Sequence, residues 1–224
     1  MGFLNKLFNK TKDNYPLLYE EKDIEALESF ISNSFGKFSS VFHEIVSPDI
    51  HVDIAIIEPN DQQDYYTLIT IGMGAYKMNV PKELSEYKLD YAEIMVRLPK
   101  EWIVNNNEEK WYWPLRWLKI LARFPLEQDT WLGDGHTIPN GEPFSEDTLL
   151  NCILLLSAVD KDSNEAIVKL PSGKIINFYT MVPLYEEEVK YKIENGVEAL
   201  LDKFDQEDIA FPPIIDKNRK NVCK

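Results

Sequence analysis

The stretch HVDIAIIEPNDQQDYYTLITI, residues 51–71, contains two apolar, β-branched runs separated by a polar segment. The runs at 51–57 and 65–71 have the composition of β-strands. The segment PNDQQDY between them has proline, asparagine and aspartate, which favour a turn because each pre-sets or stabilises turn dihedral angles. The stretch therefore predicts a β-hairpin.

The first of these runs places polar side chains at one end of a strand. Side chains alternate along a strand, so His51, Asp53, Ala55 and Ile57 are expected on one face, and Val52, Ile54 and Ile56 on the other. An imidazole and a carboxylate side by side are one residue short of a metal site or a catalytic dyad. The alternative is a polar end of a structural strand, and the structural interpretation is favoured.

Further elements extend outward from the hairpin. Residues 20–35 carry a helical apolar stripe that ends at Gly36. Additional strands are expected at 41–46 and 91–98. PLRWLKILARF, residues 114–124, predicts a helix that begins at Pro114 and ends before Pro125.

The second half of the chain predicts a loop, strands and a helix. LGDGHTIPNGEPF, 132–144, contains three glycines and two prolines and is expected to be irregular. CILLLSAV, AIVKL and KIINFYTMVPLY read as strands, the last two joined by a tight PSG turn. Residues 186–204 have the apolar spacing of one amphipathic helix.

The order of elements predicts an α+β fold, a single domain with a central, mostly antiparallel or mixed sheet flanked by helices. We divide the chain into an N-terminal extension at 1–19 (a short amphipathic helix and a linker), a domain at 20–210 and a C-terminal tail at 211–224. The expected helix MGFLNKLFNK would pack on its own domain or on a partner; nothing in the chain approaches a membrane span.

The 224 residues carry a net charge of −14, with a sequence pI near 4.7. Such a surface repels phosphates, which disfavours nucleic-acid binding. It suits solubility or the capture of a basic protein. Cys152 and Cys223 form no disulfide framework, and Cys152 reads as a small buried residue, as in a cytoplasmic protein.

Common enzyme signatures are incomplete here. GMG at 72–74 lacks the rest of a dinucleotide-binding turn, and PSGK at 171–174 lacks the upstream glycine of a phosphate-binding loop. There remains a dispersed polar set, which could in principle bind a metal for hydrolysis: His51, Asp53, Glu93 and His136. Glu93 alternates with Met95 and Arg97, so Arg97 could balance its charge on a solvated face. For the set as a whole, a structural role is favoured over recognition, and recognition over catalysis.

Two further segments have both a structural and a binding interpretation. Trp111, Trp113 and Trp117 lie within seven residues, and tryptophan is enriched both in interfaces and in cores. Their helical spacing favours the core. YEEEVKYK, residues 185–192, is interpreted as the solvated side of a helix, and secondarily as a patch for a basic partner.

The ordered segments HVDIAIIEP, YYTLITIGMGAYKMNVP, YAEIMVRLPKEW, WPLRWLKILARFP and LGDGHTIPNGEPF resemble the suppressor of fused-like domain family. The resemblance runs from about residue 25 to residue 185. It implies a protein-binding domain, not an enzyme, with no cofactor. The short, acidic chain is similar to the bacterial single-domain type, which implies an immunity protein that neutralises a toxin domain, here a basic one. A general peptide-binding scaffold remains an alternative, and the oligomeric state is open.

The resemblance also places nine residues at motif positions, without deciding whether they shape the fold or contact a partner. They are His51, Asp53, Thr70, Gly72, Met73, Glu93, Trp113, Gly135 and His136.

Overall fold

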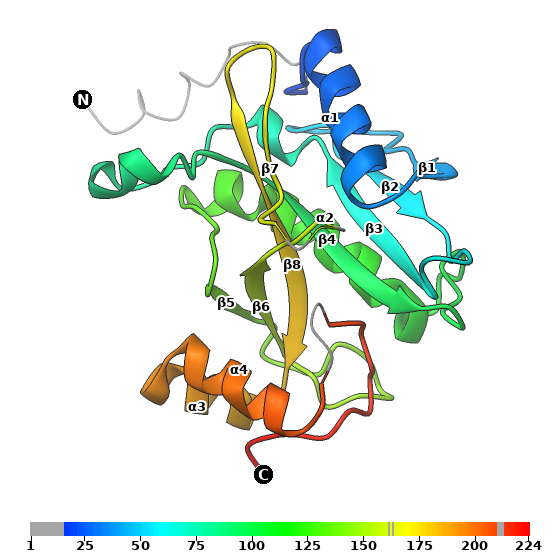
Figure 1. Cartoon of the computed structure of the whole chain (residues 1–224), viewed down its shortest axis with the longest axis vertical. Coiled ribbons are helices and arrows are strands. Elements are labelled where there is room, and N and C mark those ends of the chain that lie inside the picture. Colours follow the sequence, from blue (N-terminus) through cyan, green and yellow to red (C-terminus); the bar gives the residue numbers. More distant parts are fainter. Residues whose placement is uncertain (1–15, 161, 163, 210–212) are drawn as a thin grey trace, which may run out of the picture.

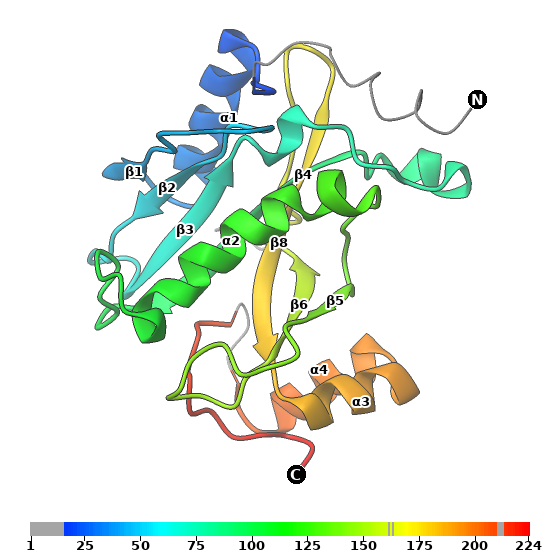
Figure 2. The same ribbon diagram turned by 180° about the vertical axis from the view of Figure 1, so that it is seen from behind.

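The computed structural model describes residues 16–160, 162, 164–209 and 213–224. These residues form an α+β fold in which helices cover both faces of one mixed sheet (Figures 1 and 2). The strands are β1 Ser40–Phe42, β2 Asp53–Ile57, β3 Tyr65–Ile71, β4 Tyr91–Pro99, β5 Thr137–Pro139, β6 Cys152–Ser157, β7 Ile167–Lys169 and β8 Ile175–Leu184. The helices are α1 Glu21–Ser34, α2 Glu109–Gln128, α3 Glu186–Asn195 and α4 Val197–Gln206, with short 3₁₀ helices η2 Met73–Ala75 and η3 Lys82–Tyr87.

Across the sheet the strand order is β1-β2-β3-β4-β8-β6-β5, and β7 also pairs with β8. All neighbouring strands are antiparallel except β4 and β8, which run parallel through the centre. The parallel pair joins the first half of the chain to the second.

The predicted hairpin of β2 and β3 is confirmed, as is the hairpin of β7 and β8. In the first, Ile54 pairs with Thr70, and Asn60 and Gln63 exchange backbone hydrogen bonds in the turn. The expected alternation also holds, because Ile54 and Ile56 pack in a different cluster from Ala55 and Ile57. Both faces of this hairpin are therefore buried.

Helices cover the two faces of the sheet. α2 lies along one face (Figure 2) and buries Trp113 and Leu118 in the larger core cluster. On the other face, α1 buries Leu27 and Ile31, and α4 packs Leu200 against β6 and β8. The predicted core role of the tryptophan-rich segment is thus confirmed for Trp113 and also for Trp117, whereas Trp111 is half-buried.

The predicted bounds of α2 were wrong. The helix runs from Glu109 to Gln128 and contains both Pro114 and Pro125 in its interior. Each proline removes a backbone donor and disfavours a helix locally. The burial of a long apolar stripe against the sheet outweighs that penalty, since tertiary packing overrides local propensity.

Three other predicted segments also need correction. The segment 132–144 is not wholly irregular, because β5 pairs with β6 at its centre, and Pro139 is tolerated there since β5 is an edge strand. The single helix predicted for 186–204 is two helices that meet at Gly196, whose φ of +91° few other residues adopt. The strand predicted for 41–46 ends at Phe42.

The acidic run 185–192 is not simply a solvated face. Glu188 is completely buried, and Arg219 from the C-terminal tail forms an ion pair with it. The remaining carboxylates of the run are partly or fully exposed.

The described residues at both proposed domain boundaries pack into the same body. Tyr19 is buried under α1, and in the tail Ile215 and Val222 are buried. The division of the chain at 19 and 210 stays a prediction. The helix predicted for the first ten residues lies outside the described residues. Within the described part of the chain, no helix combines the length and the apolar character that a membrane span needs.

Candidate functional site

Four of the candidate residues form one buried cluster around Glu93, in the middle of the sheet. The Oε1 atom of Glu93 accepts hydrogen bonds from the Tyr19 hydroxyl at 2.7 Å and from the backbone amides of Gly72 and Gly74 at 2.9 and 3.1 Å. Its Oε2 atom accepts one from the Thr70 hydroxyl at 2.5 Å. Burial raises the pKa of the Glu93 carboxyl, and these hydrogen bonds oppose that shift.

Glycine is needed at both ends of the GMG segment. The φ of Gly72 is +135°, and a Cβ there would lie 2.0 Å from the carbonyl oxygen of His51. A Cβ at Gly74 would lie 2.1 Å from the Tyr19 hydroxyl oxygen. These glycines let the backbone approach the carboxylate closely, and Met73 between them is buried. Thr70, Gly72, Met73 and Glu93 therefore lie together in the buried interior.

Glu93 and Arg97 do not pair on a solvated face. Both side chains are buried, and none of the four groups that donate hydrogen bonds to Glu93 is a cation. Arg97 lies near the Tyr65 ring, and burial lowers the pKa of its guanidinium. Two of its nitrogens, Nε and Nη1, have no hydrogen-bond partner among the described residues. The sequence-based expectation of a charge-balanced pair was wrong.

His51 and Asp53 belong to a second polar cluster beside the first. The Nε2 atom of His51 lies 3.1 Å from Asp53 Oδ1, and His43 Nδ1 lies 2.9 Å from Asp53 Oδ2. The backbone amide of Glu44 donates a further hydrogen bond to Asp53 Oδ1 at 2.9 Å. A small pocket of about 90 Å³ borders this cluster. His43 and Glu44 were not predicted from the sequence, because both follow β1 in a loop that carries no motif.

Arg123 fixes this loop to α2. Its guanidinium donates hydrogen bonds to both oxygens of Glu44 at 2.7 Å, to Asp49 Oδ1 at 3.0 Å and to the carbonyl of Ile50 at 2.9 Å. The side chains at the tip of the loop project into solvent, with Ile45 96% exposed. The loop therefore has a rigid polar base under an apolar tip.

Replacing Arg123 with alanine is expected to lower the free energy of unfolding by about 2 kcal/mol, because two half-buried carboxylates lose their charged partner. Urea denaturation measures the loss. Ile45→Ser is the matched control in the same loop and is expected to change stability by less than about 0.5 kcal/mol. An equal loss in both variants would contradict a specific clamp.

His136 and Gly135 lie in the segment that contains β5, apart from both clusters. The His136 ring packs edge-on against Trp131, with 4.3 Å between ring centroids. Burial, followed by the charge of Lys192, lowers the pKa of His136. Lys192 Nζ donates a hydrogen bond to the Gly135 carbonyl at 2.6 Å.

The residues proposed for a metal-dependent hydrolase do not converge. His51 and Asp53 contact each other, whereas Glu93 is occupied by its four donors and His136 packs on Trp131. Across the described ranges, no three His, Cys, Asp or Glu side chains form a group suited to a metal ion. The hypothesis of one four-residue site is therefore not supported by the geometry.

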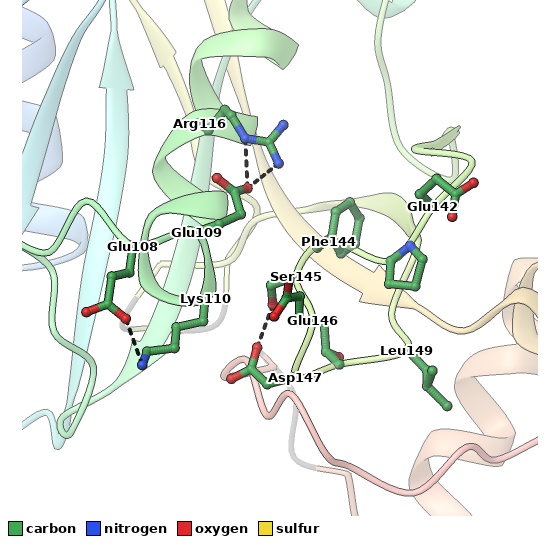
Figure 3. Close-up of a pocket in the computed structure, with 12 residues that line it drawn as sticks. Glu108, Glu109, Lys110, Arg116, Glu142, Phe144, Ser145, Glu146, Asp147 and Leu149 are labelled. Carbon is green, nitrogen blue, oxygen red and sulfur yellow. Dashed lines mark hydrogen bonds and ion pairs between the residues drawn. The ribbon is translucent and has the colours of Figure 1, made fainter.

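One large hollow in the described surface is a groove between the first turns of α2 and the segment 142–149 (Figure 3). Its volume is about 980 Å³. We call it the acidic groove, because its lining includes five carboxylates and two basic side chains: Glu108, Glu109, Glu142, Glu146, Asp147, Lys110 and Arg116.

The two basic side chains of the acidic groove are already paired. Lys110 lies 2.8 Å from Glu108, and Arg116 pairs with Glu109. Glu142 and Glu146 form no ion pair with any described residue, so a negative charge faces the solvent. Leu149 adds an apolar surface that is 67% exposed. No sequence motif marks this groove, since its two walls are far apart in the chain.

Comparisons with known proteins all indicate the same family. The sequence model of the suppressor of fused protein (SUFU) family matches residues 48–220. An uncharacterized protein of Ureaplasma parvum serovar 3 is 28% identical over 214 residues, which cover 94% of this chain and 100% of that protein.

Solved structures of this family share the fold. A suppressor of fused homologue from Neisseria gonorrhoeae superposes with a TM-score of 0.60 at 16% identity, covering 91% of this chain and 96% of that one. A chain of the Sufu-Fu complex gives a TM-score of 0.63 at 13% identity, with 93% of each chain covered. Drosophila Suppressor of Fused gives 0.58 at 14% identity, and this chain spans 50% of its length.

Proposed function

The chain belongs to the suppressor of fused family, and from this membership we propose that it is a non-enzymatic domain that binds another protein. A structural relative has been solved as part of the Sufu-Fu complex, which supports a role in protein–protein association.

In finer detail, we propose a cytoplasmic immunity or inhibitor protein that neutralises a basic bacterial toxin domain by stoichiometric binding. The net charge of −14 supports a basic partner, because opposite charges accelerate encounter. The observation that carries the proposal is the acidic groove, which combines the unpaired carboxylates Glu142 and Glu146 with the exposed Leu149. An apolar anchor within a charged rim is typical of a protein interface.

The first experiment is an affinity pull-down of the tagged chain from its native cells, with bound proteins identified by mass spectrometry. A roughly stoichiometric partner with a basic, toxic C-terminal domain would support the immunity proposal. Expression of that domain should then arrest growth in cells that lack this chain, but not in cells that also express it. Capture of no partner from cells that express the toxin gene would contradict the immunity proposal.

With the purified partner, Glu146→Lys in the acidic groove is expected to weaken binding by roughly 5- to 30-fold, because it reverses a charge beside the apolar anchor. Glu83→Lys makes the same charge change on η3, outside the groove, and is the matched control. Titration calorimetry measures both affinities. Binding that is indifferent to Glu146→Lys and to added salt would contradict the proposed groove.

A general peptide-binding scaffold is the second candidate, for which the exposed edge strand β1 is a possible peptide-pairing surface. The number of partners separates the two functions. One cognate toxin supports immunity, whereas several unrelated peptides of similar affinity support a scaffold.

A further inference from the structure

A second hollow, of about 260 Å³, opens at the edge of β8. β6 pairs with the C-terminal part of β8 and β7 with its N-terminal part, and residues 157–158 and 165–166 between these two pairings line the hollow. Four aromatic and two acidic residues line this hollow, which we call the aromatic pocket: Tyr87, Trp131, Phe178, Tyr179, Asp134 and Glu165. In the part of the chain that the structure describes, no lysine or arginine lines it.

Local contacts hold the walls of the aromatic pocket in place. The ring of Trp131 lies over Gly133, where a Cβ would come within 2.5 Å of the ring. The ring also packs edge-on against His136. Asp134 Oδ1 accepts a hydrogen bond from the backbone amide of Ser157 at 2.6 Å, which fixes the carboxylate at the end of β6. Trp131 and Asp134 are thus preorganised.

Tyr179 adds a polar group to the wall of the pocket. Its side chain lines the pocket and is only 2% exposed, yet its hydroxyl makes no hydrogen bond with any described residue. Burial, together with the negative charges of Asp134 and Glu165, raises the pKa of this hydroxyl well above its usual range. Both carboxylates are therefore close enough to the Tyr179 hydroxyl to affect it electrostatically. The hydroxyl oxygen can accept a hydrogen bond from a ligand.

The third ring, Tyr87, comes from η3, which projects from the body of the protein (Figure 1). Asn177 on β8 anchors the chain next to it, donating hydrogen bonds to the carbonyls of Lys88 at 2.9 Å and Tyr91 at 3.2 Å. Tyr87 itself is exposed, so it stands at the opening of the pocket with its backbone fixed.

We propose that the aromatic pocket binds the cationic side chain, arginine or lysine, of a protein partner. A cation within about 6 Å of an aromatic face is attracted by the ring quadrupole, most strongly for tryptophan. Asp134 and Glu165 add opposite charge, and the free Tyr179 hydroxyl accepts a hydrogen bond from the guanidinium or ammonium group. An anion would be repelled, and a neutral apolar group would leave the carboxylates and the hydroxyl unpaired.

The inference rests on the proposed function in one respect, namely that the bound cation belongs to a protein partner. It names a site separate from the acidic groove, so one partner can engage the groove, the pocket or both. The pocket is therefore tested first with small probes, without any partner.

The test follows the indole ¹H–¹⁵N signal of Trp131, assigned by its loss in Trp131→Phe, during NMR titration. The probes are N-acetyl-arginine methylamide and N-acetyl-lysine methylamide, with N-acetyl-norleucine methylamide as the neutral control at matched ionic strength. A saturable shift with either cationic probe, and none with the neutral one, supports the proposal. No saturable shift, or an equal shift with all three, overturns it.

Two variants locate the bound cation. Tyr87→Ala removes one ring and Glu165→Gln one charge, and each is expected to weaken cation binding about 2- to 5-fold. Both side chains are exposed, so neither variant should disturb folding, which the other indole signals check. Glu83→Gln on η3 does not line the pocket and should bind as the wild type does. Unchanged binding in Tyr87→Ala and Glu165→Gln would place the cation elsewhere and overturn the inference.

The same variants separate this inference from the proposed function. If the small probes fail to bind while a basic partner is still captured, the pocket inference fails and the protein-binding proposal stands. If the probes bind but no partner exists, the site is real and the proposed function fails.

Discussion

Replacing Glu93 with alanine is expected to lower the free energy of unfolding by roughly 3–5 kcal/mol. The carboxylate is completely buried and accepts hydrogen bonds from Tyr19, Thr70, Gly72 and Gly74. Alanine leaves these donors without an acceptor and opens a cavity in the middle of the sheet. Urea denaturation followed by circular dichroism measures the loss.

Glu93→Gln is the matched control and is expected to stay within about 1 kcal/mol of the wild type. Its carbonyl oxygen can replace Oε1, and its amide can donate to the Thr70 hydroxyl oxygen. Equal losses in the alanine and glutamine variants would contradict the hydrogen-bond network as the source of stability.

The stability of the wild type and that of Glu93→Gln should also depend differently on pH. The pKa of Glu93 is raised in the folded state, so the folded protein binds this proton more tightly than the unfolded chain. The stability that protonation contributes is complete below the ordinary pKa of glutamate and is lost as the pH rises through the folded-state value. The wild type should therefore gain stability relative to Glu93→Gln as the pH falls through this window. A constant difference would contradict the raised pKa.

Replacing Arg219 with alanine is expected to lower the free energy of unfolding by roughly 3–5 kcal/mol, because it leaves Glu188 buried without a charged partner. The two Arg219 Nη atoms each lie 2.5 Å from an oxygen of Glu188, and Nη2 also donates to the Pro183 carbonyl at 2.9 Å. The pair connects the C-terminal tail to the start of α3. Thermal or urea unfolding measures the effect.

Lys190→Ala is the matched control on the same helix. Lys190 pairs with Glu186 at 2.7 Å, but both side chains are well exposed, and such pairs contribute about 0.5 kcal/mol or less. If the loss in Arg219→Ala were no larger than the loss in Lys190→Ala, the tail would be a dispensable addition and not part of the packed body.

The hairpin of β2 and β3 was predictable because its signals are local. Alternation and turn composition lie within residues 51–71, and the two strands need no distant partner to be recognised. The fold class followed from the order of such segments. The length of α2 was not predictable in this way, because the interactions that retain Pro114 and Pro125 in the helix come from the sheet beneath it.

The candidate site also depends on contacts between residues that are distant in the sequence, which local patterns do not reveal. Glu93 and the GMG segment could be singled out, yet their contact depends on Tyr19, which lies 74 positions from Glu93 in the chain. The His51 and Asp53 pair was found from its strand spacing, but His43 reaches Asp53 from a loop, and Arg123 fixes that loop from a distant helix. The acidic groove has walls from two separate segments and the aromatic pocket from several, and no local pattern marks either of them.

The parallel pairing of β4 with β8 has a consequence for how the chain folds. Strands β1 to β4 pair in sequence order, with the 19 residues 72–90 as their longest connection, whereas the central ladder pairs residues such as Ala92 and Asn177, which are 85 positions apart. Closing such a long loop is entropically costly and slows folding. During synthesis, one edge of β4 therefore stays unpaired until most of the chain has left the ribosome, and this exposed edge is the point at which the nascent protein is most vulnerable to aggregation.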